Sequence, residues 1–486
     1  MAAPKADSDP NPNPSTFMVS APGKVIVFGE HSVVYDKVEA DPCERTQAKE
    51  GKNINKTKYK PHTEKSAIAA AISLRSYLHV TSSPSSSNRT VTLDFANINL
   101  VHQWSIDDLP WAAFQQEGEK KKEKKPVTSL DPVLVAALQP HVACVSVDGT
   151  ADEVRKVHQS AVSAFLYLLL SLHDASSVPP ACRFTLRSTI PIGAGLGSSA
   201  SICVCLAAAM LHQLGAIRLP SADQTVAEAR AQVERISDWA FVGEMCIHGK
   251  PSGVDNTVVS QGRAVLYRRG HGVRPLWTFP QLPLLLVDTR QAKSTAHEVA
   301  KVAALSSRHP DVVKSLLEAM DQVTNSADIL FQARALRAPK DSSPTTTLTT
   351  ATDQETNHLG ELMRINHGLL VSLGVSHPRI ERVRDLVDHQ GLGWTKLTGS
   401  GGGGCCIALK RPTVSDEDLS RLHRCLVEEN YRPLETTLGG EGVGILVVDP
   451  VGVEEFLAAE TEDDVEALVG RESVNGKGWK FWGIEG

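Results

Sequence analysis

The chain contains a loop, residues 193–197, in which three of five residues are glycine. Strand-like residues 184–190 precede it, and Ser198 and Ser199 follow it at the start of the apolar run 202–211. Glycines let backbone N–H groups converge on an anion, and a helix N-terminus also favours negative charge. The pattern indicates a phosphate-binding loop, although a tight strand-to-helix turn would have the same sequence. It is not a Walker loop, and Ser198 replaces the third glycine of the dinucleotide-binding fingerprint.

A second group of candidates lies near the N-terminus. Lys24 follows a Pro22-Gly23 turn and begins an apolar strand, a rigid position from which to project one cation. Glu30 and His31 come directly after the glycine that ends this strand, where side chains commonly line a cleft. Taken singly, Lys24 could be a solvated lysine at a strand end, and His31 a hydrogen-bonded structural histidine.

Two acidic residues form a third group. On a predicted helix, Glu244 shares a face with Ala240, Phe241 and Ile247, at i±3 and i±4 spacing. An unpaired carboxylate on such an apolar face is costly unless it meets a cation or a metal, so Glu244 is a better candidate than a glutamate that simply reaches solvent. Asp255 follows a Pro-Ser-Gly-Val turn, where an Asx-turn cap is the ordinary alternative.

A second glycine-rich stretch, residues 399–404, formally contains G-x-G-x-x-G. The apolar residues 405–409 that follow it predict a strand and not a helix, so the stretch is not a nucleotide-binding fingerprint. We expect a loop whose backbone approaches another loop or a ligand very closely.

Composition restricts the class of protein. A chain of 486 residues exceeds the size of one core, so two domains are expected. A net charge of −6 gives no reason to expect a nucleic acid or an anionic membrane as partner. The nine cysteines, several of them in apolar runs, are expected to be reduced in a cytoplasmic protein, and Cys405-Cys406 lacks the spacing of a zinc site. The longest apolar runs are too short to span a bilayer.

The pattern of elements predicts an α+β chain that divides near residues 276–282. Domains are predicted at residues 17–278 and 279–486, after a disordered tail at 1–16. A strand pair is expected within 18–28, and 38–65 is expected to be a disordered insertion, 115–126 a charged loop and 338–356 a flexible loop. The predicted helices are 152–173, 202–214, 222–247, 310–336, 356–373, 378–389 and 415–429, and the late strands are 405–410 and 444–448.

Four motifs in this order carry a resemblance to a known family: APGKVIVFGEHSVVY, PIGAGLGSSAS, HGKPSGVDN and KLTGSGGGGC. Together they resemble the galactokinase, homoserine kinase, mevalonate kinase and phosphomevalonate kinase (GHMP kinase) superfamily. In detail they are most similar to the mevalonate kinases. The resemblance covers the chain from about residue 17 to its end, apart from the predicted insertion and loops.

The resemblance implies a ribosomal-protein-S5-like N-terminal domain and a ferredoxin-like C-terminal domain, with the active site between them. It implies ATP-dependent phosphorylation of the primary hydroxyl of mevalonate in isoprenoid and sterol biosynthesis, with Mg²⁺, and a homodimer is expected. The implied ATP-binding residues are Gly193, Ala194, Gly195, Leu196, Gly197, Ser198 and Ser199. Ser199 and Glu244 would hold Mg²⁺, Asp255 would be the base, and Lys24 would stabilise the developing charge. Lys24, Glu30, His31 and Thr295 would bind mevalonate.

The chain departs from the family after the first motif, where Asp36 stands in place of the usual glycine and residues 38–65 intervene. The insertion is either a tolerated surface loop or sequence translated from an unspliced intron. We favour the second, because joining Lys37 to Ser66 restores the family-like sequence YDKSAIAAAISL. Two other functions stay open: a non-catalytic ligand sensor on the same fold, and a kinase for another substrate such as phosphomevalonate.

Overall fold

The computed structural model describes residues 16–35, 65–83, 88–118, 129–146, 150–221, 223–337, 351–447, 453–459, 461–470 and 478–483. The predictions of a disordered tail, of the insertion at 38–65 except Lys65, and of most of the charged and flexible loops lie outside these residues.

Contacts divide the chain into two compact units. Unit 1 comprises Met1–Lys24, Ala71–Arg263 and Gly439–Gly486, and unit 2 comprises Val25–Ala70 and Ala264–Leu438. This division differs from a single boundary near residue 278, because the chain leaves unit 1 early and returns to it at the end. The order of predicted helices and strands along the sequence does not reveal that the last segment packs with the first unit.

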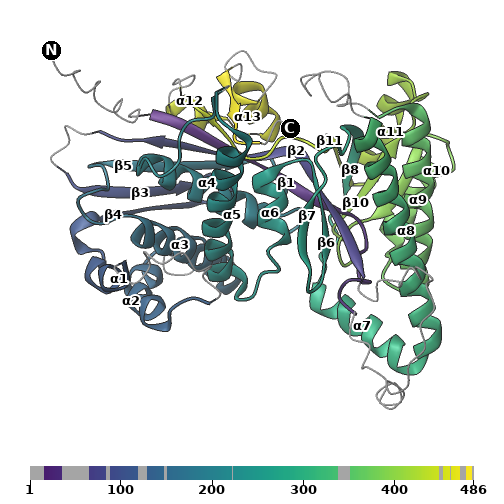
Figure 1. Cartoon of the computed structure of the whole chain (residues 1–486), viewed down its shortest axis with the longest axis horizontal. Helices are drawn as coiled ribbons and strands as arrows, with labels where there is room; N and C mark the ends of the chain where they lie inside the picture. The colour runs from purple at the N-terminus through teal and green to yellow at the C-terminus, as the bar shows by residue number, and fades with distance from the viewer. Residues whose placement is uncertain are drawn as a thin grey trace, which may run out of the picture. The chain divides into compact units, whose positions relative to one another are not determined.

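The sheet of unit 1 is mixed (Figure 1). Strand β12 pairs antiparallel with both β1 and β13, β2 pairs antiparallel with β5, and β3 pairs parallel with β5 and antiparallel with β4. The strands are β1 (Thr16–Phe28), β2 (Ser66–Thr81), β3 (Thr90–Phe95), β4 (Leu100–Ser105), β5 (Cys182–Ser188), β12 (Gly444–Leu446) and β13 (Lys480–Phe481). Of these, β1 and β2 also contribute residues to unit 2.

Helix α4 is the central helix of unit 1 and contacts α3 and α5. It is apolar all round, and nearly all of its residues after the first turn are buried, which is typical of a helix inside a core. The helices of unit 1 are α1 (Trp111–Gly118), α2 (Pro132–Ala143), α3 (Asp152–Leu172), α4 (Ser198–Gln213), α5 (Val226–His248), α6 (Val254–Gln261), α12 (Val453–Ala458) and α13 (Glu462–Val469). Short 3-10 turns lie at Ala96–Ile98 and Ile106–Asp108.

Unit 2 contains an antiparallel sheet in the order β11-β8-β10-β9 and a smaller ladder in which β6 pairs with β7 and with Ser66 to Ala70 of β2. Its strands are β6 (Ala264–Arg268), β7 (Gly272–Pro275), β8 (Leu282–Asp288), β9 (Gly393–Leu397), β10 (Cys405–Lys410) and β11 (Arg432–Leu438). Its helices are α7 (Thr295–Arg308), α8 (Pro310–Arg337), α9 (Asp353–Ser372), α10 (Pro378–Asp388) and α11 (Asp416–Glu428).

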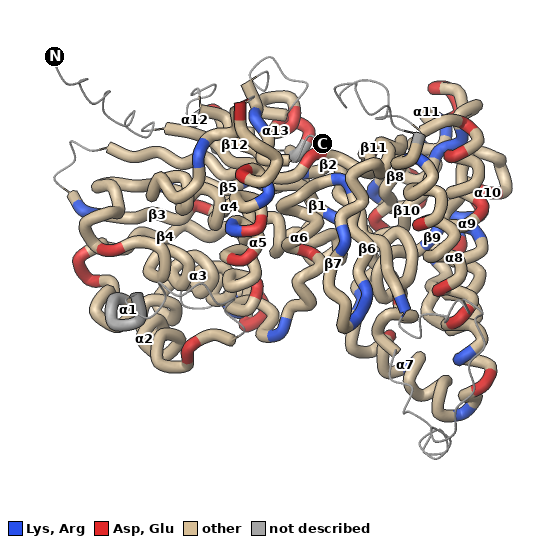
Figure 2. Tube along the Cα trace, in the orientation of Figure 1, with Lys and Arg blue, Asp and Glu red and all other residues tan. Residues whose placement is uncertain are grey.

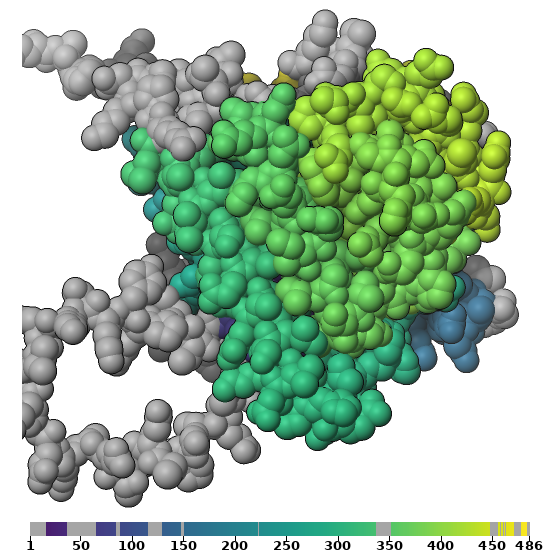
Figure 3. All heavy atoms as spheres, turned by 90° about the vertical axis from the view of Figure 1, so that its right-hand side faces the viewer, coloured from purple at the N-terminus to yellow at the C-terminus, as the bar shows by residue number. Residues whose placement is uncertain are grey.

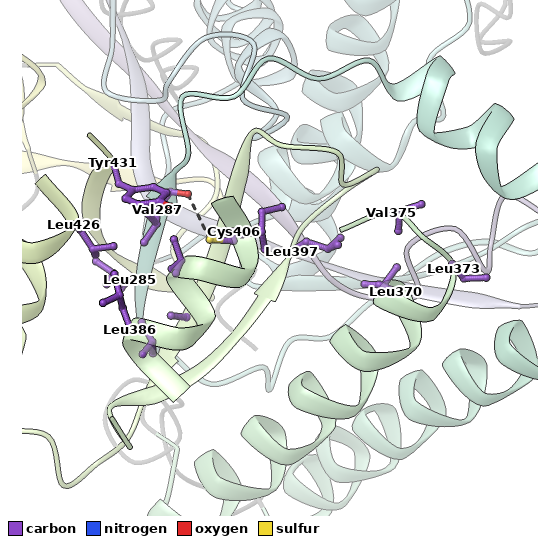
Figure 4. Close-up of a cluster of buried hydrophobic side chains, with 14 of the residues drawn as sticks. Leu285, Val287, Leu370, Leu373, Val375, Leu386, Leu397, Cys406, Leu426 and Tyr431 are labelled. Atoms are coloured by element: carbon purple, nitrogen blue, oxygen red, sulfur yellow. Dashed lines mark hydrogen bonds between the residues drawn. The ribbon is translucent and has the colours of Figure 1, made fainter. Parts of the chain in front are cut away.

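Helices α9, α10 and α11 pack on the strands of unit 2, and their apolar residues meet those of β8, β9 and β10 in one core (Figure 4). This core includes Leu285, Val287, Leu370, Leu397 and Cys406. The helices α8 to α11 form the green face in Figure 3. On α10 and α11 both signs of charge are interspersed (Figure 2), as in the ion pairs that Arg382 makes with Asp385 and Glu429.

Most predicted elements are confirmed, with ends that shift by a few residues. The strand pair expected within residues 18–28 is wrong, because β1 continues through Pro22-Gly23 as one strand. The chain is extended where a turn was expected, and there the backbone N–H of Lys24 donates to the carbonyl of the distant Leu196 at 2.8 Å. Two expected loops are shorter than predicted. Helix α1 extends to Gly118, and α9 begins at Asp353 after a Thr352 capping box.

Within the described part of the chain, no helix is both long and apolar enough to cross a membrane.

Candidate active site

In the 193–197 loop of unit 1, the backbone conformation alternates between left-handed and other φ values. Gly193, Gly195 and Gly197 have φ values of +75°, +81° and +74°, and the two residues between them are not in this left-handed region. A Cβ at Gly197 would lie 2.8 Å from Cγ of Lys24, so a side chain there would collide with the lysine. Alternating backbone of this kind forms an anion-binding concavity.

Helix α4 begins directly after this loop. Its N-cap, Gly197, makes no side-chain capping hydrogen bond, and no acidic residue lies in the first turn. The first N–H groups of the helix therefore remain without a side-chain acceptor at this cap, where the helix dipole is positive. The geometry of both loop and helix start suits a phosphate group.

Lys24 and Asp255 meet beside this loop. The side chain of Lys24 is only 8% exposed, and its Nζ lies 3.2 Å from Oδ2 of Asp255. The same ammonium lies 3.5 Å from the carbonyl oxygen of Gly195. Asp255 lies in the first turn of α6, a helix that the sequence prediction treated as a turn, and its side chain is 33% exposed. A cation and a carboxylate thus lie together beside the candidate phosphate-binding loop.

Glu244 is buried within α5, as its apolar helix face predicted, and only 2% of the residue is exposed. Burial raises the pKa of its carboxyl to about 8, and the nearby charge of Asp255 adds to the shift, while Lys24 and a hydrogen bond with Ser199 oppose it. Its Oε2 has no hydrogen-bond partner among the described residues. A buried oxygen without a partner is costly, and a bound cation would compensate that cost.

Sequence reasoning missed His248. Its Nε2 lies 2.9 Å from Oγ of Ser199, the second residue of α4. His248 follows Glu244 by four residues on α5, and residues at this spacing share a helix face. The i, i+4 spacing from Glu244 could therefore have identified His248 as a candidate site residue from the sequence.

The donors present fit a magnesium ion that is bound together with phosphate. Ser199 offers a hydroxyl and Glu244 a carboxylate, which are hard oxygen ligands of the kind that Mg²⁺ prefers. No cluster of three or more His, Cys, Asp or Glu side chains that could hold a metal occurs in the part of the chain that the structure describes. Substrate phosphates and water would therefore have to complete the coordination, as is usual for Mg²⁺.

In unit 2, His31 and Thr295 are both linked to Ser400, in the second glycine-rich loop. His31 Nε2 lies 2.9 Å from the carbonyl oxygen of Ser400, and the Ser400 hydroxyl lies 3.3 Å from Oγ1 of Thr295. Burial lowers the pKa of His31, against the hydrogen bond to Ser400 and the charge of Glu30, which raise it. His31 has a φ of +44°, a strained value for a residue with a side chain.

Glu30 differs from its neighbour, because both of its carboxylate oxygens have protein partners. Oε1 forms an ion pair with Lys396, and Oε2 accepts a hydrogen bond of 2.8 Å from Nδ2 of Asn366. Sequence reasoning identified neither partner, since Lys396 belongs to a buried strand and Asn366 to a helix outside every motif.

The 399–404 loop approaches its neighbours as closely as predicted. A Cβ at Gly401 would lie 2.1 Å from the carbonyl oxygen of Val375, and one at Gly402 would lie 2.5 Å from Glu298. Strand β10 follows at Cys405, which confirms that the loop does not begin a helix. This loop is packed against protein at Gly401 and Gly402, whereas nothing lies within 4 Å of a Cβ placed at Gly193.

Comparison with known proteins places these features in a family. The model of the GHMP kinases N terminal domain matches residues 160–262, and that of GHMP kinases C terminal matches residues 354–428. A mevalonate kinase of Gibberella zeae is 55% identical over 98% of this chain and 89% of its own length. Human mevalonate kinase is 32% identical over 88% of this chain and 94% of its own length.

Solved structures show the same fold. L. major mevalonate kinase in complex with R-mevalonate has a TM-score of 0.55 at 21% identity and covers 89% of this chain and 99% of its own. Methanococcus jannaschii mevalonate kinase has a TM-score of 0.52 at 21% identity and covers 87% of this chain and 98% of its own.

Proposed function

This chain belongs to the mevalonate kinases of the GHMP kinase family, and we propose how its own residues carry out the ATP-dependent phosphorylation of mevalonate. The observation that supports the proposal most directly is the Lys24–Asp255 pair beside the 193–197 loop. It joins a base and a cation to a phosphate-binding loop, and the chemistry of phosphoryl transfer asks for little more than positioned charges.

Asp255 is the proposed base, which accepts the proton of the primary hydroxyl of mevalonate as that oxygen attacks the γ-phosphorus. Its exposed fraction of 33% leaves the carboxylate within reach of a substrate. Lys24, 3.2 Å away, stabilises the negative charge that develops on the attacking oxygen and the phosphoryl group. Its burial strengthens this interaction, because little water screens it.

Gly193, Ala194, Gly195, Leu196, Gly197, Ser198 and Ser199 are the proposed ATP-binding residues, through the backbone of the loop and the first turn of α4. Ser199 and Glu244 would hold Mg²⁺, which neutralises phosphate charge when bound. The Glu244 carboxyl fits this role since one of its oxygens is buried without a partner among the described residues.

His31 and Thr295 are the proposed mevalonate-binding residues of unit 2, with Lys24 in unit 1. The shared partner Ser400 supports this assignment, because it brings an imidazole and a hydroxyl group of distant segments to one place. Glu30, also expected to bind substrate, has its carboxylate oxygens engaged by Lys396 and Asn366.

The finer attributes remain proposals: a homodimer in the cytoplasm that serves isoprenoid and sterol biosynthesis, with domains at 17–278 and 279–486. The insertion at 38–65 likewise stays a prediction.

An assay of ADP release with mevalonate, phosphomevalonate, galactose and homoserine tests the function. We expect turnover with mevalonate. Turnover of phosphomevalonate alone would favour the related kinase, and binding of ligand with no turnover of any substrate would favour the sensor. The presence of Lys24, Ser199, Glu244 and Asp255 together argues against the sensor.

A further inference from the structure

Glu30 belongs to a buried polar cluster that the proposed reaction does not use directly. Its partner Lys396 is 0% exposed, and Asn366 is also 0% exposed. Lys396 Nζ donates to Oε1 of Glu30 and, at 2.8 Å, to the carbonyl oxygen of Leu397. Desolvation lowers the pKa of Lys396, and the charge of Glu30 and its hydrogen bond oppose this shift.

A buried pair of this kind contributes little to stability compared with two apolar side chains. Removing an ion from water is expensive, and mutual attraction repays the expense only when the geometry is excellent. Apolar residues of similar volume often stabilise a core as well or better. Stability therefore does not explain the pair. One explanation is that it fixes the position of the Glu30 side chain and of the chain segment around it.

The cluster joins the segment that bears His31 to the base of the second glycine-rich loop. Gly29, with a φ of +86°, begins this segment, and a Cβ there would lie 2.1 Å from the carbonyl oxygen of Ser66. On one side of Glu30, Ile26 exchanges two hydrogen bonds with the Thr398 hydroxyl, at 3.1 and 2.9 Å. On the other side, His31 bonds Ser400. These hydrogen bonds and the Glu30–Lys396 pair join residues 26–31 to residues 396–400, and the Glu30–Lys396 pair is the charged one.

The bond to Ser400 fixes the state of the His31 ring. A carbonyl oxygen can only accept, so Nε2 carries a proton, and in the neutral ring Nδ1 is then an acceptor. Nδ1 is buried and has no partner among the described residues. Tyr35 stacks beside the ring, with planes 10° apart and centroids 6.3 Å apart. Any movement of the 29–32 turn would change what this ring offers to a substrate.

We propose that Lys396 and Asn366 are positioning residues that anchor the buried Glu30 carboxylate, and through it hold the His31 ring in one orientation against the 399–404 loop. Glu30 itself is part of this anchor and does not contact mevalonate. The inference rests on the proposed role of His31 in mevalonate binding.

The test compares Lys396→Met, Glu30→Leu and the double variant. Each single variant leaves one buried charge or polar group without its partner, and we expect a lower melting temperature and a KM for mevalonate raised by roughly tenfold or more. In the double variant the melting temperature returns toward that of the wild type, since an apolar pair replaces the ion pair. The KM for mevalonate stays high there, while the KM for ATP changes little.

A matched control lies in the same unit. Arg334 of α8 and Glu355 of α9 also form a buried ion pair, with side chains 7% and 11% exposed, and neither residue belongs to the 29–32 turn or to the 399–404 loop. Arg334→Met should lower the melting temperature without changing the KM for mevalonate. A double variant with both a restored melting temperature and a wild-type KM would overturn the proposal, because the pair would then be only a packing device.

A second readout does not depend on turnover. In protein labelled with ¹⁵N-histidine, with His31 assigned by His31→Gln, we expect one Nε2-protonated tautomer in the wild type. We expect mixed tautomers or broadened signals in the double variant and in Asn366→Leu, which serves if Lys396→Met fails to fold. Unchanged His31 signals in these variants would refute the positioning role. Lack of mevalonate turnover by the wild type would instead refute the proposed function and leave this measurement interpretable.

Discussion

The two glycine-rich loops of this chain look alike in sequence and differ in what surrounds them. At Gly193 in the first loop, nothing lies within 4 Å of the position that a Cβ would occupy. At Gly401 in the second, the nearest backbone oxygen is only 2.1 Å from that position. In the first loop glycine leaves open space at residue 193 and makes room for the Lys24 side chain at residue 197, whereas in the second it lets backbone pack on backbone. A glycine count therefore does not identify a ligand site, and the surroundings decide.

The same contrast extends to the charged side chains. Near the first loop, Asp255 is partly exposed and Glu244 has an oxygen without a partner among the described residues. Near the second, the oxygens of Glu30 are both paired. Substitutions near the first loop should therefore change the chemical step and nucleotide binding, and substitutions near the second should change folding and the placement of substrate groups.

The largest effect on activity is expected from Asp255→Asn. An amide cannot accept the hydroxyl proton, so kcat should fall by roughly 100-fold or more, the scale for loss of a positioned base. The KM for ATP should change little. Steady-state kinetics would measure both, with Asp107→Asn as control, since Asp107 forms an exposed ion pair with Arg89 in the same unit. If the Asp255→Asn enzyme keeps nearly full activity, Asp255 is not the base and has only a structural role in the first turn of α6.

Alanine at Gly401 and at Gly193 tests the loop comparison directly. At Gly401, overlap with Val375 and a left-handed backbone should together destabilise the protein by about 3 kcal/mol or more. At Gly193 nothing lies within 4 Å of the new methyl group, so only the backbone strain remains, about 1–2 kcal/mol, in the loop proposed to bind phosphate. Urea unfolding and ATP titration of both variants provide the measurement. Equal losses of stability, or unchanged ATP affinity for Gly193→Ala, would contradict the contrast drawn between the loops.

Glu244→Gln should weaken the Mg²⁺-dependent part of nucleotide binding by at least about tenfold, because a neutral amide replaces a charged ligand. Binding of ATP without metal should stay near that of the wild type. Titration of nucleotide with and without Mg²⁺ separates the two, and Glu234→Gln, at an exposed position of the same helix, is the control. If wild type and Glu244→Gln respond equally to Mg²⁺, the buried carboxylate has only a structural role.

Sequence reasoning found what local pattern encodes. The 193–197 loop, the helix after it and the apolar face of Glu244 depend on residues close together in the chain, and each was predicted. The partners of Glu30 were not, because Lys396 and Asn366 are more than 300 positions away and their types alone suggest an exposed lysine and a helix-surface amide. The strand pair failed for a similar reason: Pro22-Gly23 has the composition of a turn, and the partner strand β12 of β1 lies more than 400 positions away in the chain.

The pH dependence of stability extends the comparison to both units, since each contains a buried histidine. Burial lowers the pKa of His173, at the end of α3 in unit 1, to about 4 from 6.5, and that of His367, on α9 in unit 2, to about 4 as well. Above pH 6.5 the imidazoles are neutral in folded and unfolded chains, so they contribute no pH dependence. Between pH 6.5 and 4 the imidazoles bind a proton in the unfolded chain but not in the folded one. The free energy of unfolding must therefore decrease as the pH is lowered through this range.

The size of this loss is about 3 kcal/mol for each histidine at the acid end of the range, from a pKa difference of about 2.5. His173→Gln and His367→Gln should each flatten the acid side of the stability curve, measured by urea unfolding between pH 7 and 4.5. Hydrogen exchange would assign the effect, with protection of α3 restored by the first substitution and that of α9 by the second. Identical slopes for wild type and both variants would mean that neither histidine is protonated on unfolding in this range. Carboxylate partners such as Glu381, which bonds His367 at 3.0 Å, would then carry the acid sensitivity.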